Sequence, residues 1–294
     1  MPELPDIAVY VERLGALLRG RVIQRVRVAN PFVLRTVEPP ISAVAGRRVD
    51  GFDRIGKRIV VQLDGDLFLV VHLMIAGRLR WREPGRTIGG RIVLAEFSFE
   101  HGTLYLTEAG TTRRAMLHVV QRAESLRAFD RGGIDPMESD LDTFARVLRS
   151  ENHTLKRSLT DPRLFSGIGN AYSDEILHRA GISPLALSGK LADDDVARLH
   201  CAVRETLADW TARLRSEAGD ALPDKVTAFH PQMAVHGRYG QPCPVCGAPV
   251  QRIRYAANET NYCARCQTNG RILADRAMSR LLKDDWPRSI DDIE

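Results

Sequence analysis

The chain has 294 residues, of which 44% are hydrophobic and 27% are charged. That is enough to bury a normal core, and it suits two domains better than one. No apolar run reaches the ~20 residues that a bilayer-spanning helix needs. The acidic start Met-Pro-Glu-Leu-Pro-Asp has no apolar segment of the kind found in secretion signals. The expected location is therefore cytoplasmic or nucleoid-associated, and the net charge of +5 only weakly favours a polyanionic partner.

The N-terminal part of the chain is predicted to be one helix followed by a β-rich domain. Apolar residues recur at helical spacing within residues 7–19. From about residue 22 to residue 120, short β-rich runs alternate with Gly, Pro and Asp, which is typical of an antiparallel sandwich or barrel. The runs are Val22–Val28, Arg58–Leu63, Leu67–Leu73, Arg91–Phe97 and Thr103–Leu106.

A segment rich in Gly, Asp and Pro, residues 129–140, is expected to link this domain (residues 1–128) to a helical one (residues 141–232). The helical domain is followed by a cysteine-bearing module (residues 233–271) and a C-terminal extension (residues 272–294). Helical periodicity covers Leu141–Arg149, His153–Leu159, Asn170–Ala180, Asp193–Arg215 and, in the extension, Asp275–Lys283.

Four of the five cysteines form two C-x-x-C pairs, whose separation is that of a four-cysteine zinc site. They are Cys243, Cys246, Cys263 and Cys266. Because protein sulfurs fill all four positions, the site is expected to be closed and structural. Zinc ribbons bind DNA, RNA and proteins alike, so the site alone does not assign a function. The fifth, Cys201, is predicted to be a buried thiol in a helix.

Two short motifs are ambiguous by themselves. The glycines before Asn170, in Phe165-Ser-Gly-Ile-Gly-Asn170, would let helix amides approach an anion such as phosphate, but a plain turn between helices explains them equally well. Removal of Met1 would expose the secondary amine of Pro2, which condenses with an aldehyde to an iminium, with Glu3 beside it as acid or base. Most chains that begin in this way have no such chemistry.

Taken together and in order, five motifs resemble the formamidopyrimidine-DNA glycosylase / endonuclease VIII family. They are Met-Pro-Glu-Leu-Pro, Gly56-Lys57-Arg58, His72-Leu-Met-Ile-Ala-Gly77, Gly167-Ile-Gly-Asn170 and the four-cysteine finger. The resemblance implies an α+β fold with an N-terminal helix and β-sandwich, a helix–two-turns–helix domain and a zinc finger. Double-stranded DNA would lie in the cleft between the two halves.

The resemblance also implies residue roles. Pro2 would be the nucleophile at the sugar C1′ carbon and Glu3 the acid that helps to open the sugar ring. Lys57 and Asn170 would contact phosphates at the lesion, and Lys156 would face the DNA. The implied activity is base excision with β- and δ-elimination of the abasic site. The protein would carry one structural zinc ion and is expected to act as a monomer.

Several recognition positions depart from the family pattern. Asp6 and Ala8 stand where further glutamates are usual. Met74 and Ile75 occupy the wedge segment, and Arg113 or Arg114 is the candidate to face the orphaned base, without the usual phenylalanine after them. In the finger, Asn258 replaces the usual arginine, so Arg252 or Arg254 is expected to supply the charge.

These departures spare the residues of the chemistry, so the sequence predicts a glycosylase/lyase with altered recognition, removing damaged and most plausibly oxidised bases. Two alternatives stay open. One is a non-catalytic binder of DNA damage or DNA structure on the same scaffold. The other is a zinc-ribbon RNA-binding or translation factor, which explains the finger and the charge but not the N-terminus.

Overall fold

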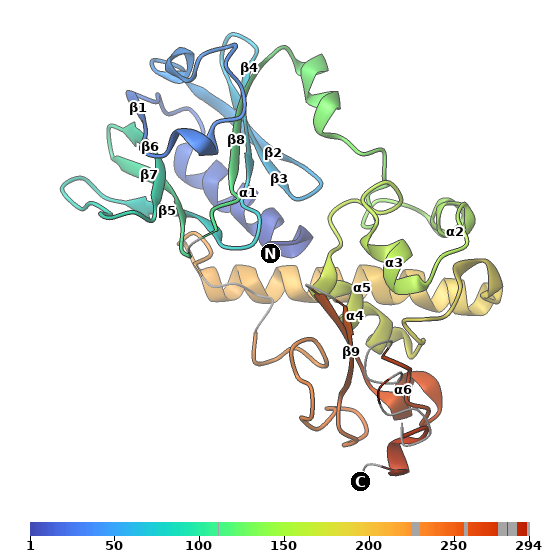
Figure 1. The fold of residues 1–294 in the computed structure, drawn as a ribbon. Coiled ribbons are helices and arrows are strands. Elements are labelled where there is room, and N and C mark those ends of the chain that lie inside the picture. Colours follow the sequence, from blue (N-terminus) through green and yellow to red (C-terminus); the bar gives the residue numbers. More distant parts are fainter. Residues whose placement is uncertain (111, 225–229, 256–257, 276–280, 282–286, 293–294) are drawn as a thin grey trace. The chain divides into compact units, whose positions relative to one another are not determined.

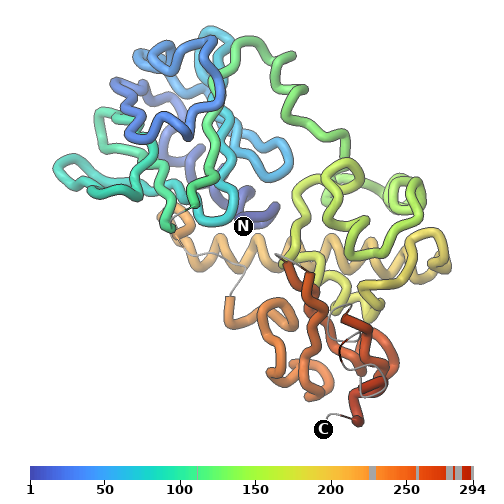
Figure 2. The backbone as a smooth tube through the Cα atoms, viewed as in Figure 1, coloured from blue at the N-terminus to red at the C-terminus, as the bar shows by residue number. Residues whose placement is uncertain are grey.

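The computed structural model describes all residues except 111, 225–229, 256–257, 276–280, 282–286 and 293–294. The chain forms two compact units (Figure 1, Figure 2). The first contains Met1–Arg131 and Trp210–Thr227, and the second contains Gly132–Asp209 and Ala228–Glu294. Within the described ranges, no helix combines the length and the apolar character that crossing a membrane requires.

The first unit begins with helix α1 (Leu4–Leu18), which starts three residues before the predicted one. Pro5 occupies the first turn, where its missing N–H costs nothing. Glu3 and Asp6 form a capping box, in which Asp6 Oδ2 accepts a hydrogen bond from the Glu3 amide at 2.8 Å. The apolar face of α1 includes Leu14 and packs on the sheet that contains β2 and β3.

Two four-stranded antiparallel sheets form the sandwich that the sequence predicts. Their strand orders are β1-β6-β7-β5 and β2-β3-β4-β8. The strands are β1 (Arg25–Val28), β2 (Val49–Ile55), β3 (Arg58–Leu63), β4 (Leu67–His72), β5 (Gly77–Arg82), β6 (Val93–Phe99), β7 (Gly102–Glu108) and β8 (Met116–Gln121). Buried aliphatic and aromatic side chains of both sheets and of α1 share one core. Short 3-10 helices cover Pro31–Val33, Ile41–Val44 and Ala123–Phe129.

Three strands were not among the predicted runs: β2, β5 and β8. In β5, arginines occupy alternate positions, which leaves few apolar residues to form a run. In β2, Asp53 and its charged neighbour Arg54 interrupt the apolar residues, and β8 is a short run that contains His118.

The second unit is helical and contains the cysteine-bearing module. Its helices are α2 (Leu141–Arg149), α3 (Leu155–Thr160), α4 (Asn170–Ala180) and the first part of α5 (Asp193–Ala218), with a 3-10 turn at Ser188–Lys190. The module consists of the hairpin β9 (Gln251–Tyr255) and β10 (Asn258–Tyr262) followed by α6 (Ala264–Thr268). α4 packs against β10 and α6. The α+β fold predicted from the sequence is therefore confirmed.

The end of α5 and the residues after it belong to the first unit, although the sequence periodicity grouped them with the helical segment. Arg215 makes a bidentate ion pair with Glu12 of α1. Its Nε and Nη2 atoms each lie 2.7 Å from a carboxylate oxygen of Glu12. Beyond the helix, the Tyr10 hydroxyl donates to the Pro223 carbonyl at 2.5 Å, and Arg80 pairs with Asp224 at 2.8 Å. The start of the loop that follows α5 is thus attached to α1 and β5.

The prediction of a buried Cys201 is wrong. Its thiol is exposed and lies 3.0 Å from the Glu205 carboxylate. The buried face of α5 contains Leu199, Val203 and Leu207. Cys201 lies two residues from Leu199, so a rotation of about 200° places it on the opposite side of the helix.

The C-terminal extension packs on the finger in the parts that are described. Ile272, Leu273 and Ile290 are buried in the same apolar cluster as the hairpin and the cysteines. Arg271 and Ser289 form an antiparallel bridge. The predicted helix Asp275–Lys283 falls mostly on residues outside the described ranges.

Replacing Leu14 by alanine is expected to lower the free energy of unfolding by about 2–5 kcal/mol, because a fully buried leucine leaves both lost burial and a cavity. Urea unfolding of the zinc-loaded protein, followed by circular dichroism, measures the change. The Ala16→Ser control lies on the exposed side of the same helix and should change little. Equal stabilities of the Leu14→Ala variant and the unaltered protein would contradict the packing described.

Candidate functional site

The chain's first residues are packed into the first unit. Pro2 is buried, and Glu3 and Leu4 are only 2% and 3% exposed. Glu3 is the residue at which α1 begins, so the helix fixes its position directly beside Pro2. Asp6, which departs from the family pattern, has a defined role here as the partner of the Glu3 amide.

The surroundings of the N-terminus favour a neutral amine. Burial lowers the pKa of the Met1 amine below its ordinary value, and the charges of Arg78 and Lys57 lower it further, against the opposing effect of Glu3 and Asp6. Arg78 lies on β5 and is only 5% exposed, which is rare for an arginine. Arg78 could not be identified from the sequence, because a single arginine in a strand gives no signal of burial.

Lys57 is placed by a tight hairpin. The pairing of β2 with β3 extends to the pair Ile55 and Arg58, so the turn consists of Gly56 and Lys57. Gly56 has φ +58°, which suits the first central position of a two-residue hairpin.

His72 pairs with Arg58 on the neighbouring strand, next to the hairpin. Burial lowers the pKa of His72 to about 4, and the charges of Arg58 and Lys57 add to the effect. The imidazole is therefore neutral at pH 7, and the positive charge beside the β2–β3 hairpin comes from Lys57 and Arg58.

The segment after β4 forms a tight turn that presents Ile75. The Gly77 amide donates to the Leu73 carbonyl at 2.9 Å, and Met74 adopts a left-handed conformation at φ +54°. A Cβ on Gly77 would lie 2.2 Å from the Leu73 carbonyl oxygen, so only glycine fits there. At the tip of the turn, Ile75 is 54% exposed, which is unusual for a large aliphatic side chain.

A buried carboxylate holds the segment that carries Arg113 and Arg114. Glu108, at the end of β7, is 1% exposed and accepts hydrogen bonds from the amides of Arg114 and Ala115, both at 2.9 Å. The side chain of Arg114 is exposed and that of Arg113 is half-buried. No pattern in the sequence assigns a role to Glu108. Only the structure shows that it closes this loop.

In the second unit, Asn170 is the first residue of α4. Gly167 precedes it at φ +89°, and Gly169 forms the N-terminal cap in an extended conformation. The Asn170 side-chain amide donates to the carbonyl of Glu259 in β10 at 3.1 Å. This contact joins the glycine-rich turn to the finger hairpin.

Lys156 is largely buried where α3 packs on α4. It is 9% exposed, and its ammonium donates to Asp174 Oδ1 at 2.5 Å and to the Asn170 carbonyl at 2.6 Å. Asp174 is itself buried and also lies 2.7 Å from His236 Nδ1. A charge held this way stabilises the packing of α3 on α4, and direct contact with DNA would require breaking that pair.

The finger hairpin presents the remaining predicted residues. Arg252 lies over the Tyr239 ring, 4.1 Å from its centroid, and 3.7 Å from the Glu259 carboxylate. Arg254 and Asn258 are exposed near the hairpin turn, and the Arg254 amide donates to Asp275 at 2.6 Å. Of the two arginines, Arg254 therefore has the more accessible charge.

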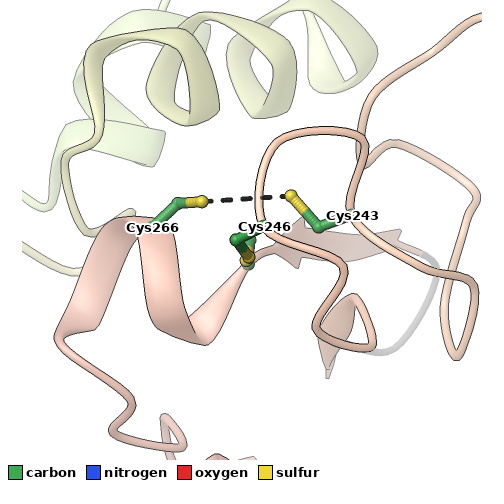
Figure 3. A group of neighbouring side chains, drawn as sticks. Cys243, Cys246 and Cys266 are labelled. Carbon is green, nitrogen blue, oxygen red and sulfur yellow. Dashed lines mark hydrogen bonds between the residues drawn. The ribbon is translucent and has the colours of Figure 1, made fainter.

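The four predicted cysteines come together in one cluster, in which all four sulfurs lie within 4.8 Å of one another. Figure 3 shows Cys243, Cys246 and Cys266 of this cluster. The Cys243–Cys266 and Cys246–Cys263 sulfur distances are 3.9 and 3.3 Å. Four thiolates at about 2.3 Å from a tetrahedral zinc ion would be about 3.8 Å apart, so the cluster fits zinc.

The protonation of the thiols also points to a cation. Burial raises the pKa of Cys263 to about 11, against a backbone hydrogen bond from Cys266, and also raises the pKa of Cys266, whereas hydrogen bonds from the Ala248 backbone and the other thiols lower the pKa of Cys246 despite its burial. Thiolates this close together and this buried need a metal ion to neutralise them.

Three family models match the chain and together cover most of it. The formamidopyrimidine-DNA glycosylase N-terminal domain matches residues 1–117, the H2TH domain of the same enzymes matches residues 133–215, and the zinc finger found in FPG and IleRS matches residues 240–269. These matches define the class: a two-unit protein with a DNA glycosylase N-terminal domain, a helix–two-turns–helix domain and a finger. They also confirm the single structural zinc ion.

Curated proteins that are similar to this chain carry the same family name. The chain is 34% identical to the formamidopyrimidine-DNA glycosylase of Moorella thermoacetica over 266 residues, which are 86% of this chain and 95% of the relative. It is 34% identical to that of Thermus thermophilus over 278 residues, 92% of this chain and all of the relative. A formamidopyrimidine-DNA glycosylase-like protein of Mycobacterium tuberculosis is 42% identical over 151 residues, half of this chain.

Solved structures have the same fold. The Thermus thermophilus MutM (Fpg) protein matches with a TM-score of 0.75 and 32% identity, covering 90% of this chain and 98% of the other. Lactococcus lactis Fpg in complex with DNA containing an abasic site matches with a TM-score of 0.81 at 24% identity, covering 90% and 99%. The chain belongs to the formamidopyrimidine-DNA glycosylase family.

Removing the Glu108 carboxylate is expected to loosen the arginine-bearing loop. In a Glu108→Ala variant, two amides lose a buried acceptor, which costs about 1–3 kcal/mol and speeds hydrogen exchange at Arg114 and Ala115 by about 10- to 100-fold. Exchange measured by mass spectrometry checks this. Glu108→Gln keeps an acceptor oxygen and should stay close to the unaltered protein, as should Glu100→Ala on a neighbouring exposed turn. Unchanged exchange in Glu108→Ala would show that the loop is held by other contacts.

Zinc affinity is expected to fall as the pH falls. Because the raised thiol pKa values keep Cys263 and Cys266 protonated at neutral pH without metal, zinc must displace their protons. Each displaced proton weakens binding by about tenfold per unit decrease in pH. Competition with a chromophoric chelator at pH 6.0 and pH 7.5 measures the slope. A pH-independent affinity would mean that the thiols are already ionised.

Proposed function

We propose that this protein is a base-excision-repair DNA glycosylase with abasic-site lyase activity, whose nucleophile is the amine of Pro2 after removal of Met1. The observation that carries the proposal is the buried Pro2 held beside the equally buried Glu3 at the start of α1, in a chain of this family. An unprotonated secondary amine is a good nucleophile and forms a charged iminium directly.

The chemistry follows from these groups. The Pro2 nitrogen attacks the sugar C1′ carbon, and the damaged base leaves with the electron pair of the glycosidic bond and takes up a proton. Glu3 is placed to protonate the sugar ring oxygen, so that the ring opens to an iminium. The iminium accepts electrons while a proton is lost from C2′ and the 3′ phosphate departs, and a second elimination releases the 5′ phosphate. Water then hydrolyses the remaining iminium, which returns the Pro2 amine and frees the enzyme.

DNA binding is assigned to groups in both units. In the first, Lys57 at the hairpin tip is proposed to contact a phosphate, Met74 and Ile75 to fill the space left by an extruded nucleotide, and Arg113 or Arg114 to face the orphaned base. In the second, Asn170, at the first turn of a helix, is proposed to contact a phosphate.

The finger would add charge through Arg254 and Arg252, with Asn258 as a neutral contact. The proposed partner is double-stranded DNA with a damaged base or an abasic site. We expect the protein to act as a monomer in the cytoplasm, at the nucleoid. The burial of Lys156 favours a supporting role for this residue over direct contact with DNA.

A covalent adduct with abasic-site DNA tests the nucleophile. Borohydride should trap an adduct with the mature protein, and an N-terminally extended chain in which the Pro2 nitrogen is an amide should form none. Cleaving the extension to leave Pro2 first should restore trapping. Pro2→Gly keeps only a primary amine and should trap at least about tenfold more slowly, since it loses direct iminium formation.

Binding of the same duplex, measured without borohydride, serves as the control, because the extension must not simply prevent association. Adduct formation at equal rates before and after cleavage would rule out Pro2. Duplex binding without any adduct, in zinc-loaded protein with Pro2 at its N-terminus, would favour the non-catalytic binder.

The pH at which borohydride trapping is half-maximal is expected to depend on the positive charge of Arg78. The pKa of the Met1 amine is lowered by burial and further by Arg78. We expect the same surroundings to act on the Pro2 amine once Met1 is removed, so that trapping rises with pH through a midpoint below the ordinary value, because only the neutral amine reacts. Arg78→Met removes a nearby positive charge and should move the midpoint to higher pH. Arg82→Met, further along the same strand, is the matched control. An unchanged midpoint in Arg78→Met would show that the charge of this arginine does not reach the amine.

A further inference from the structure

The C-terminal half of α4 touches the zinc cluster through a histidine. His178 Nε2 lies 3.3 Å from the sulfur of Cys243, and the two residues are only 7% and 3% exposed. They are 65 positions apart in the sequence, so the contact joins the helical part of the second unit to the finger. His178 is not a member of the four-cysteine cluster.

The metal determines the direction of this hydrogen bond. A cysteine sulfur bound to zinc is a thiolate, which has no proton to donate. The imidazole must therefore carry its proton on Nε2 and donate it to the sulfur. A donor aimed at a ligand sulfur fixes the orientation of the ligand, and loss of such outer contacts typically weakens metal binding.

A second contact joins the same two regions. The Gln267 side chain accepts a hydrogen bond from the Cys263 amide at 2.8 Å and donates one to the Ile182 carbonyl, just beyond α4, at 2.9 Å. Two of the four cysteines are thus attached to the end of α4, one through its sulfur and one through its backbone.

The other parts of α4 are attached to the same module. At its beginning, Asn170 donates to the Glu259 carbonyl in β10. In its middle, Glu175 accepts hydrogen bonds from the amides of Ala234, Val235 and His236 at 2.7–2.9 Å. The helix therefore supports the finger along its whole length, and among these contacts the His178–Cys243 contact is the one made to a cysteine sulfur.

We propose that His178 is a positioning residue of the zinc site, which donates its Nε2 proton to the Cys243 thiolate and so couples retention of zinc to the helix that begins with Asn170. This role depends on the zinc site and not on the glycosylase activity. A histidine that merely fills space against the finger could be replaced by an aromatic residue without consequence. A hydrogen-bond donor could not.

Two substitutions separate these roles. His178→Phe keeps the volume and removes the donor, whereas His178→Gln keeps an N–H donor. Arg179→Gln is the matched control, because Arg179 is next in sequence but pairs with Asp209 on α5. The readouts are the rate of zinc transfer to a chromophoric chelator and, after cobalt substitution, the energy of the sulfur-to-cobalt charge-transfer band.

We expect His178→Phe to release zinc about tenfold or more faster than the unaltered protein, in line with the effect of losing an outer contact at other metal sites. The charge-transfer band should move to lower energy, because a sulfur without its hydrogen bond is a better electron donor. His178→Gln should restore part of both effects, and Arg179→Gln should change neither. A folded His178→Phe protein with unaltered release and spectrum would overturn the proposal.

A measurement on the unaltered zinc-loaded protein keeps the test independent of variants that fail to fold. With ¹⁵N-labelled histidine, a long-range ¹H–¹⁵N spectrum shows which ring nitrogen of His178 carries the proton. A proton on Nε2 supports the hydrogen bond to sulfur. A neutral ring with its proton on Nδ1 alone would contradict it, whatever the variants do.

Discussion

The buried N-terminus is the constraint on which the chemistry depends. An ammonium group taken out of water is costly, so burial lowers the pKa of the Met1 amine against the opposing charges of Glu3 and Asp6. The capping box between Glu3 and Asp6 starts α1 at the fourth residue, so only the capping residue Glu3 lies between the helix and Pro2. The rest of the first unit supports this arrangement, since the apolar face of α1 is part of the sandwich core.

A comparable constraint organises the second unit, where adjacent carboxylates are buried on α4. Asp174 is paired with Lys156 and His236, and Glu175 accepts three backbone hydrogen bonds. Burial raises the pKa of Glu175 while the three amides oppose that rise, so most of its favourable contacts come from backbone dipoles rather than from a cation. Groups satisfied in this way give α4 one defined position against the finger.

Much of the fold could be predicted because its signals are local. The bounds of α2 and α4 match the predicted ranges, and the spacing of the cysteines predicted a cluster that the structure contains. Strands with alternating charge, such as β5, were missed because their apolar residues are too few to form a run. Cys201 was predicted to be buried because apolar residues surround it in the sequence. Positions two apart on a helix lie on nearly opposite sides, so Cys201 is exposed although Leu199 and Val203 are buried.

Contacts between distant segments could not be read from the sequence. Lys156 lies where the family motif suggests a DNA contact, but only the fold shows that Asp174 is 2.5 Å away. Glu108, Arg78 and His178 are single polar residues in ordinary surroundings along the chain. Their importance comes from burial and from partners that are up to 65 positions away, which no local pattern contains.

The nucleophile is the central claim, and locating the covalent bond tests it most directly. After trapping on abasic-site DNA, nuclease and trypsin digestion followed by mass spectrometry identifies the modified peptide and residue. The account predicts that the sugar remnant is on the nitrogen of Pro2, in the N-terminal peptide that ends at Arg13. A remnant on a lysine, such as Lys57, with the Pro2 amine unmodified, would contradict it.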